Sequence, residues 1–588
     1  MTNKKQKLEL TWIGKDKRPK LEPRILLEDP SKSYHAKHKV TENDLFDNKL
    51  IFGDNLLALK ALEQGYTGKV KCIYIDPPFN TGSAFTHYDD GLEHSIWLDL
   101  MRKRMDILHR LLAEDGCIFV HLDDNELDYL KVLMDEVFMR ENFINRITIE
   151  ARSPSAFSTV NAGVFKASEY ILWYAKNKKV FTQPQKLRVR RSPDYAYNKW
   201  LLNPEDDCGS WEFISIQEAF DSYGNTRSRR PDTLLESFNK FIVENSHRVC
   251  RLASISDAKA GAEIVALKQE SLKLRGKVFL LERDLYDDVY VLDGQQIIFY
   301  SKNVVELDGE LSASSPLTNI WTDVAWEGIA GEGGVTFNQG KKPERLIKRC
   351  LELSTLPDDL VLDSFGGSGT TGAVAHKMGR RWIMVELGEH CHTHIIPRLQ
   401  KVIDGTDQGG ISKAVNWQGG GGFRYYKVAP SLLEKDRWGQ WIINREYNAA
   451  MFAEALCKLE GFTYAPSDTE FWNQGYSTEN DRIYVTTQSL MLEQLQAISE
   501  EVGANRTLLI CCSAFRAKPD QFANLTLKKI PKMVLNKCEW AHDDYSLNVE
   551  NLPMQAPDEV IETATQKTKK NAQKQPGLQG LFDEEDAE

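Results

Sequence analysis

The chain has 588 residues, of which 41% are hydrophobic and 27% charged, a composition typical of a soluble globular protein. This length is too great for a single hydrophobic core, so we expect several domains. No run of 18 apolar residues occurs, and the first residues lack the apolar stretch of a secretion signal. We therefore exclude an integral membrane protein and expect a cytoplasmic one.

The net charge of −11 argues against DNA binding at first sight, because contacts to phosphates need Lys and Arg. The charge is unevenly distributed, however: five of the last six residues are acidic, whereas residues 176–191 contain seven basic residues and no acid. Patches of this kind steer nucleic acids or are simply solvated loops, and charge alone favours neither. The basic residues that we select as candidate DNA contacts are Lys186, Arg188, Arg190, Arg191, Arg227 and Arg229.

Apolar patterns predict an α/β core in two separate parts of the chain. Strands are expected over 69–75 and 117–122, with helices over 96–112 and 127–137. The alternation fades between 145 and 323, where one helical pattern covers 258–274. It then returns, and the expected elements are a helix from 343, a strand over 360–362, a helix after 369 and a strand over 382–385.

No metal site is predicted. The ten cysteines form no Cys-x-x-Cys pair, so reduced thiols are expected. The run from His390 to His394 contains three histidines and one cysteine, but no second group of ligands accompanies it, so the surface of an ordinary helix is the favoured interpretation.

A glycine-rich turn follows the strand that ends near residue 362. Gly367, Gly369 and Gly372 match G-x-G-x-x-G, and Glu386 follows Gly369 by 17 residues at the end of the next strand. Glycines let the backbone approach a ligand, and a carboxylate at a strand end accepts hydrogen bonds from ribose. This pattern fits a nicotinamide dehydrogenase as well as a methyltransferase, and a purely structural turn is a third interpretation. A phosphate-binding loop is excluded, since no Gly-Lys pair is followed by Ser or Thr.

The sequence Asp76-Pro77-Pro78-Phe79, continued by Asn80-Thr81-Gly82, ends the strand over 69–75, where an open α/β sheet places its active site. Methylation of an exocyclic amine needs acceptors for its two N–H groups, and the Asp76 carboxylate and the Pro77 carbonyl can supply them. The prolines restrict the backbone, and Phe79 offers a flat face on which an extruded base can stack. The alternative is a simple turn at the end of a strand.

With these two motifs, the sequence resembles the DNA amino-methyltransferases, in which an aspartate in the place of Asp76 is associated with adenine N6. Phe79 replaces the more common tyrosine. C5-cytosine enzymes use a Pro-Cys nucleophile, and this chain contains no Pro-Cys pair. The Asp-Pro-Pro-Phe motif precedes the glycine turn by 289 residues, which resembles the circularly permuted β class with its target-recognition region between the motifs. The segments 51–59, 122–126 and 342–346 further resemble the modification subunits of type III restriction–modification systems.

The resemblance implies a permuted Rossmann-like fold, S-adenosylmethionine as cofactor and several site residues. Asp54 would contact the cofactor adenine, Glu386 its ribose, and Phe365, Gly366, Gly367 and Gly369 its methionine end. Lys342 and Pro343 would begin a helix that covers the cofactor, and Asp363 and Thr370, on either side of the glycine turn, would also belong to the cofactor-binding site. The expected regions are an arm (1–45), a catalytic half (46–145), a target-recognition region (146–323), a cofactor-binding half (324–430), a C-terminal domain (431–560) and a disordered acidic tail (561–588).

By the same resemblance, the substrate would be double-stranded DNA, methylated at adenine N6 in a specific sequence. The chain would act as a homodimer in phage defence, together with a restriction subunit that carries helicase and nuclease activities. A solitary or nuclease-fused methyltransferase, N4-cytosine specificity included, is the main alternative. An oxidoreductase would leave residues 76–79 unexplained, and a DNA-specificity subunit with a decayed active site is disfavoured because both motifs are intact.

Overall fold

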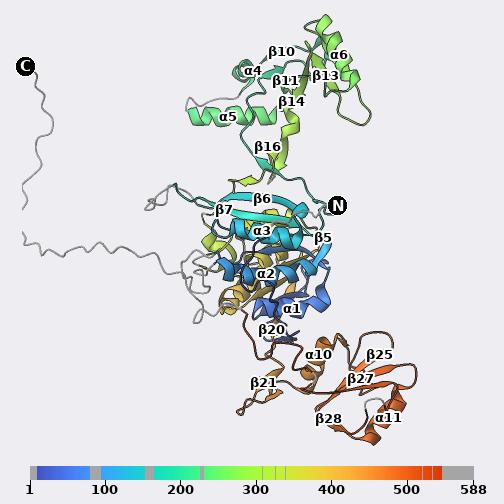
Figure 1. Cartoon of the computed structure of the whole chain (residues 1–588). Coiled ribbons are helices and arrows are strands. Elements are labelled where there is room, and N and C mark those ends of the chain that lie inside the picture. Colours follow the sequence, from blue (N-terminus) through green and yellow to red (C-terminus); the bar gives the residue numbers. More distant parts are fainter. Residues whose placement is uncertain are drawn as a thin grey trace, which may run out of the picture.

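The computed structural model describes residues 9–79, 94–152, 164–224 and 231–545, apart from 308, 325, 327, 338–339, 519–520 and 533. Three bodies follow one another along the long axis of the molecule, with a central α/β body between an inserted region and a C-terminal domain (Figure 1). No described helix has both the length and the apolar character needed to cross a membrane.

An eleven-stranded sheet forms the middle of the central body, in the order β1-β20-β3-β19-β18-β4-β5-β7-β6-β17, with β2 also paired to β20. The strands from β20 to β5 run parallel, whereas β7 is antiparallel to both β5 and β6. Their bounds are β1 Leu26–Glu28, β2 Tyr34–His35, β3 Asn48–Phe52, β4 Val70–Ile75, β5 Leu112–Leu122, β6 Phe143–Glu150, β7 Ser168–Ala175, β17 Ile320–Trp321, β18 Leu360–Asp363, β19 Arg381–Glu386 and β20 Gly422–Val428.

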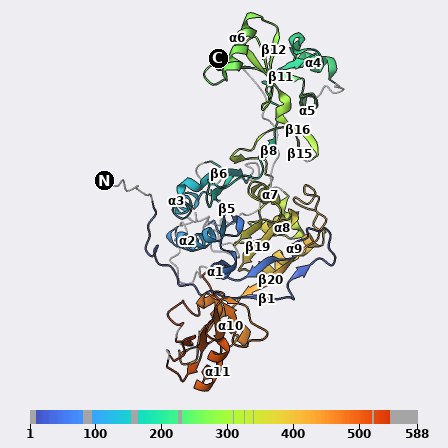
Figure 2. The same cartoon turned by 90° about the vertical axis from the view of Figure 1, so that its right-hand side faces the viewer.

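Helices cover both faces of this sheet (Figure 2), which explains why the side chains of β4 and β18 are mostly buried on both faces. On one face lie α1 (Asn55–Tyr66), α2 (His94–Leu111) and α3 (Leu127–Phe138), and on the other α7 (Glu344–Glu352), α8 (Thr370–Lys377) and α9 (Ile396–Ile403). Side chains alternate between the two faces along β4. Ile73 and Ile75 pack in the core beneath α1, α2 and α3, whereas Cys72 and Tyr74 pack in the core beneath α7, α8 and α9. The predicted Rossmann-like α/β fold is confirmed.

The permuted order of the motifs is explained by the pairing of β18 with β4. Val361 lies opposite Cys72 and Leu362 opposite Ile73, although 289 residues separate the corresponding sequence motifs. The glycine turn after β18 and the Asp76 segment after β4 therefore emerge side by side at the carboxyl edge of one sheet.

The inserted region is built from two small sheets, a six-stranded one in the order β10-β9-β11-β14-β13-β12 and a three-stranded one, β15-β16-β8. Its elements are β8 Arg188–Arg190, β9 Lys199–Leu201, β10 Phe213–Ser215, α4 Ile216–Tyr223, α5 Pro231–Glu244, β11 Val249–Ser254, α6 Ala262–Lys273, β12 Val278–Leu281, β13 Val289–Leu292, β14 Gln295–Phe299, β15 Val304–Leu307 and β16 Glu310–Pro316. The boundary expected at 145/146 lies inside β6, and β6, β7 and β17 all belong to the central sheet.

The first 45 residues are not a separate arm where the structure describes them. β1 and β2 both pair with β20 and extend the edge of the central sheet. Arg24, which is 1% exposed, forms an ion pair of 2.9 Å with Glu22 and donates to the carbonyl of Ala429. The polar character of this segment hid these contacts, because its charged side chains are satisfied inside the protein.

The C-terminal domain has its own core and a five-stranded sheet, β23-β24-β25-β27-β29. Its elements are β21 Leu433–Lys435, β22 Trp441–Ile443, α10 Ala449–Glu460, β23 Thr463–Tyr464, β24 Gly475–Tyr476, β25 Asp481–Val485, β26 Ser489–Leu490, α11 Leu492–Val502, β27 Thr507–Cys512, β28 Ala514–Phe515 and β29 Leu525–Lys529. The expected acidic tail, 561–588, lies outside the described residues.

Candidate active site

Asp76 stands at the carboxyl end of β4 and is the centre of the site. Its Oδ2 atom lies 3.2 Å from the Nζ atom of Lys342. Its Oδ1 atom is buried and has no hydrogen-bond partner among the described residues, although 20% of the whole side chain is exposed. A buried carboxylate oxygen without a donor costs free energy, so this atom marks a position where an N–H group of a bound molecule would be stabilised.

The turn that carries Asp76 is held from the side by α2. The indole Nε1 of Trp97 donates to the carbonyl of Pro78 at 2.8 Å, and this indole is almost fully buried. Phe79 packs against the core of the same face, with its ring 5.9 Å from that of His121. The backbone of the motif is therefore rigid where the structure describes it; Asn80, Thr81 and Gly82 lie outside the described residues.

Lys342 brings the two halves of the site together. Its ammonium contacts Asp76 on β4, lies 3.5 Å from Oε2 of Glu169 on β7, and sits 4.4 Å from the centre of the Phe79 ring. Burial alone would lower the pKa of this lysine, but Asp76 and Glu169 together raise it above its usual value. The ammonium is therefore firmly charged.

Glu169 completes a chain of buried polar groups. His121 Nε2 lies 2.8 Å from Glu169 Oε2, and the other ring nitrogen of His121 lies 2.9 Å from the hydroxyl of Tyr74. Burial opposes the ionisation of Glu169, but Lys342 and His121 outweigh it and lower the pKa of this carboxyl to about 2. For Asp76 the balance is reversed, because burial raises its pKa more than Lys342 and His121 lower it.

The glycine turn after β18 is shaped by backbone angles that favour glycine. Gly367 has φ +52° and Gly369 has φ +77°. A Cβ atom on Gly369 would approach Ile395 at 3.1 Å, whereas one on Gly367 would meet the Phe365 carbonyl at an ordinary contact distance of 3.8 Å and would have room beside the turn. Asp363 braces the turn by accepting from Phe365 N at 2.9 Å and from the Thr371 hydroxyl at 2.6 Å. Burial raises the pKa of Asp363 to about 7.

Glu386 closes the other side of this turn. It is 2% exposed and accepts from the backbone N–H groups of Gly367 at 2.7 Å and of Leu387 and Gly388 at 2.8 Å each. His390 lies 3.1 Å from the same carboxylate. His390 is itself 1% exposed, so the expectation that it lies on a helix surface is wrong; it packs beneath the strand end as a partner of Glu386.

These residues fit a nucleoside cofactor that bears an amino-acid end. The open space at Gly367 admits a ligand against the backbone, and Glu386 supplies a carboxylate next to it. Phe365, Gly366 and Thr370 belong to the same turn, and the Thr370 hydroxyl lies 3.3 Å from the Lys342 carbonyl. The structure thus brings together the residues expected at the methionine and ribose ends.

Asp54 and Pro343 are both helix N-caps. Asp54 accepts from Leu57 N at 3.0 Å at the start of α1, and its other oxygen accepts from Tyr545 N at 3.1 Å. Pro343 precedes α7, with Lys342 directed toward Asp76. The cofactor contacts expected of Asp54, Lys342 and Pro343 remain predictions.

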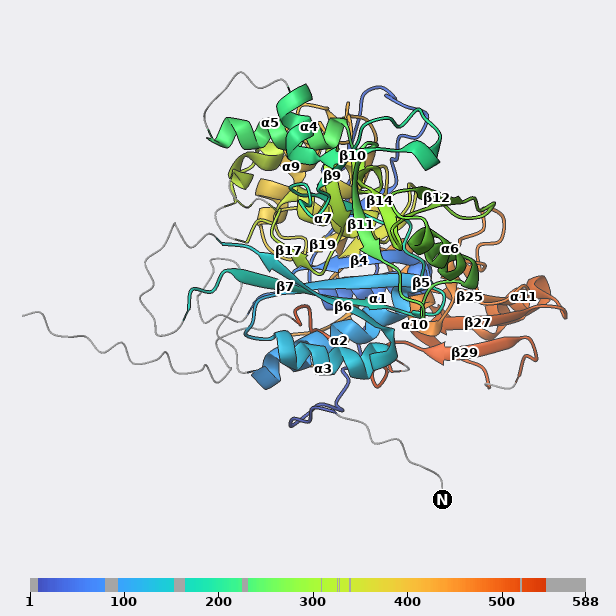
Figure 3. The same ribbon diagram turned by 90° about the horizontal axis from the view of Figure 1, so that it is seen from above.

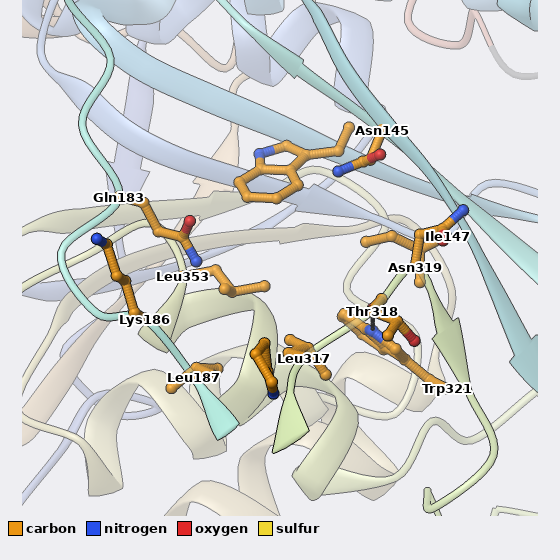
Figure 4. Close-up of a pocket in the computed structure, with 12 residues that line it drawn as sticks. Asn145, Ile147, Gln183, Lys186, Leu187, Leu317, Thr318, Asn319, Trp321 and Leu353 are labelled. Atoms are coloured by element: carbon orange, nitrogen blue, oxygen red, sulfur yellow. Dashed lines mark hydrogen bonds between the residues drawn. The ribbon is translucent and has the colours of Figure 1, made fainter. Parts of the chain in front are cut away.

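The basic residues selected as DNA contacts differ in their surroundings. Lys186 is exposed and lines a cavity of about 450 Å³ where the inserted region meets β6, β7 and β17 (Figure 4). Arg188 is half-buried and donates to Ser314 and Asn303, which gives it a structural part in the β8–β16 pair. Arg190 and Arg191 are exposed. Arg227 and Arg229 lie outside the described residues.

Four buried site residues carried no recognisable signal in the sequence: His121, Glu169, Glu344 and Arg398. His121 stands one residue before the end of β5, and Glu169 lies in β7, so proximity to a strand end was the one available indication. Arg398 donates to the Ser368 carbonyl and to Thr370, and thereby holds the glycine turn from behind.

Comparisons with known proteins agree with this arrangement. A family model described as DNA methylase matches residues 70–397. The probable type III HindVI Mod subunit of Haemophilus influenzae is 35% identical over 416 residues, which cover 65% of this chain and 54% of that protein. The EcoPI Mod subunit of Escherichia phage P1 is 30% identical over 448 residues, which cover 68% of this chain and 65% of that protein.

The chain thus spans about half to two thirds of the length of these two relatives. Among solved structures, a putative DNA modification methylase from Thermus thermophilus, complexed with S-adenosyl-L-methionine, is 14% identical. The match covers 65% of this chain and 99% of that one, with a TM-score of 0.30.

Proposed function

Since the chain belongs to the DNA methylase family, we propose that it transfers a methyl group from S-adenosylmethionine to N6 of adenine in duplex DNA. One observation carries this proposal: the partnerless Oδ1 atom of Asp76 lies at the end of β4, beside the glycine turn that follows β18. An acceptor for the target amine and a binding place for the methyl donor then share one sheet edge.

The residues of the chain prepare the amine for transfer. Asp76 Oδ1 accepts one N–H of the amine and the Pro77 carbonyl the other, which draws the nitrogen lone pair out of conjugation with the ring. Phe79 offers its ring to the extruded base. S-adenosylmethionine, when bound, supplies the methyl group of a sulfonium, so that an N–C bond forms as an S–C bond breaks and the amine loses one proton.

The glycine turn and Glu386 hold the methyl donor in this proposal. Glu386 accepts from the ribose hydroxyl groups, and the turn from Phe365 to Gly369 accommodates the methionine end. Asp54 is assigned to the adenine end and the start of α7 to a cover over the cofactor. Asp363 and Thr370 maintain the shape of the turn through the contacts described above.

We further propose that the chain is the modification enzyme of a cytoplasmic restriction–modification system and acts as a homodimer with a restriction subunit. The names of the relatives support this role. The inserted region is proposed to recognise the target, and it lies in front of the central body when the molecule is viewed from above (Figure 3). Transfer to cytosine N4 is the second candidate, because the matching family model is named for both N6 and N4 methyltransferases.

The exchange Asp76→Ala tests the assignment of the acceptor. Methyl transfer to DNA should disappear, while calorimetric binding of S-adenosylmethionine should persist, because the glycine turn and Glu386 are unchanged. Asp115→Ala is the control, since Asp115 is exposed, lies in β5 and pairs with Lys71. If Asp76→Ala abolishes cofactor binding, or if the wild-type protein binds NADH instead, the proposed function is wrong.

A further inference from the structure

One ammonium group contacts both working side chains of the Asp-Pro-Pro-Phe motif. Lys342 Nζ lies 3.2 Å from Asp76 Oδ2 and 4.4 Å from the centre of the Phe79 ring, and its side chain is 7% exposed. We infer that Lys342 and Glu169 are positioning residues that set the orientation and the charge of the Asp76 acceptor, an inference that rests on the proposed function.

Lys342 fixes the orientation of the acceptor. A carboxylate on a single side chain can rotate, and rotation would move Oδ1 away from the target amine. The contact of Oδ2 with the ammonium prevents this rotation and leaves Oδ1 for the substrate. The same ammonium rests on one face of Phe79, so the base is left the opposite face. One ammonium group, through its contacts with Asp76 and Phe79, therefore sets the distance between the acceptor and the stacking ring.

Glu169 offsets the positive charge that Lys342 places next to Asp76. The target nitrogen becomes positive as the methyl group arrives, so a negative environment lowers the barrier. Asp76 and Lys342 alone would sum to zero charge, whereas Glu169, 3.5 Å from the ammonium, adds a second negative charge beside this pair. His121 in turn holds the Glu169 carboxylate at 2.8 Å and is itself tied to Tyr74.

Several other titratable groups act on this cluster and must be considered in any pH profile. Burial raises the pKa of Asp76, Lys342 and His121 lower it, and Glu169 raises it again. Four further described groups interact electrostatically with Asp76 or Glu169: Tyr74, Asp123, Arg152 and Asp363.

The inference predicts that two exchanges shift the acidic limb of the pH–rate profile in opposite directions. Lys342→Met removes a cation, so the pKa of Asp76 rises and the limb moves to higher pH, with kcat about 100-fold lower because the acceptor is no longer aligned. Glu169→Gln removes an anion, so the limb moves to lower pH, yet the kcat plateau still falls at least about 10-fold. KM for S-adenosylmethionine stays near the wild-type value in Glu169→Gln.

Methyl transfer to duplex DNA is measured in the steady state from pH 5 to 9, with unfolding followed by circular dichroism. Lys348→Met and Glu150→Gln are the matched controls, because Lys348 lies on the outer part of α7, paired with Glu352, and Glu150 is exposed on the neighbouring strand β6. Both controls should behave like the wild type. Lys342→Arg keeps the charge and should retain the wild-type acidic limb.

Several outcomes would overturn the inference. If the acidic limbs of Lys342→Met and Glu169→Gln move in the same direction, or do not move, Lys342 and Glu169 have only a structural role. A faster Lys342→Met enzyme would mean that the ammonium merely occupies the place of the substrate amine. If Lys342→Met does not fold, Glu169→Gln and Lys342→Arg still test the inference. The charge argument is contradicted if the acidic limb of Glu169→Gln moves to higher pH. It is also contradicted if the acidic limb of Lys342→Arg differs from that of the wild type. Absence of transfer in the wild type would show that the proposed function fails, and the inference with it.

Discussion

At the scale of single residues, burial changes the chemistry of several carboxyl groups in different directions. Glu169 keeps its charge because a lysine and a histidine lie against it, whereas Asp363 meets only neutral donors, the Phe365 N–H and the Thr371 hydroxyl. The pKa of Asp363 accordingly rises to about 7. Near one sheet edge, the Glu169 carboxyl thus loses its proton readily, whereas the Asp363 carboxyl retains its proton to a higher pH.

Asp363 therefore gives the fold a dependence on pH that can be measured. Its pKa in the folded protein is higher than in the unfolded chain, so the folded state binds its proton more tightly. The stability contribution is fully present below pH 4 and is lost as the pH rises to about 7, with a size on the order of 4 kcal/mol.

Asp363→Asn should remove this loss while it preserves the acceptor for Phe365 N. We expect its free energy of unfolding to change less between pH 4.5 and 7.5 than that of the wild type, as measured by urea denaturation at each pH. Parallel pH curves for the two proteins would show that Asp363 titrates normally and that the turn is braced in another way.

Gly367 offers a second test of a single residue. Alanine at φ +52° is strained by about 1 kcal/mol, and its methyl group would project into the space assigned to the cofactor. Gly367→Ala should therefore weaken S-adenosylmethionine binding at least about tenfold in calorimetry, which corresponds to about 1.4 kcal/mol. Gly379→Ala is the matched control, because Gly379 has φ +68°, open space at its Cβ position and a place at the far end of α8. Equal effects of both exchanges on binding would refute the assignment of the space.

At the scale of elements, four buried charges lock the cofactor half together. Lys377 on α8 pairs with Glu344 on α7 at 2.8 Å and with Asp407 at 2.7 Å, and Arg398 on α9 pairs with Glu344 at 2.9 Å. All four side chains are at most 2% exposed, and their charges sum to zero. Removal of one partner leaves a buried charge uncompensated, which is far more costly than the intact pair is stabilising.

Lys377→Met should accordingly lower the free energy of unfolding by about 3–5 kcal/mol. Lys348→Met on α7 removes a partly exposed pair with Glu352 and should cost at most about 0.5 kcal/mol. Thermal and urea denaturation would measure both. Similar small decreases in the two variants would mean that water reaches the buried cluster.

The same elements show what the sequence could and could not predict. β4, β18 and β19 are buried on both faces, so their apolar runs were unmistakable. β6 and β7 were missed as central strands because Arg146, Glu150 and Glu169 interrupt their apolar pattern. Among the described residues, Glu169 forms ion pairs with Lys342 and His121, which are distant in sequence, and no local pattern reveals such a partnership.

At the scale of the whole molecule, recognition and chemistry occupy different bodies. The inserted region has its own cores and is joined to the central sheet through β8, β16 and β17. We propose that Lys186, Arg190 and Arg191, which are exposed at this junction, contact DNA phosphates. Arg188 is excluded from that group because it is half-buried and bonded to Ser314 and Asn303, whereas Arg190 is exposed and its contacts are to Glu310 and the Leu307 carbonyl at the surface.

Exchange of Lys186, Arg190 and Arg191 for glutamine should reduce the slope of log K against log salt concentration by about 1 for each phosphate that is no longer neutralised. Fluorescence anisotropy with a duplex at several salt concentrations measures this slope. The matched triple exchange of Lys518, Lys529 and Lys532, exposed lysines of the C-terminal domain, should leave it unchanged. An unaltered slope in the first variant would make those basic residues ordinary surface charges.

The identity of the methylated base tests the central claim most directly. The wild-type protein is incubated with S-adenosylmethionine carrying a labelled methyl group and with genomic DNA of mixed sequence, and the DNA is digested to nucleosides for mass spectrometry. The account predicts label in N6-methyladenine, present with the wild type and absent with Asp76→Ala. Label confined to cytosine, or equal labelling by the two proteins, would contradict it.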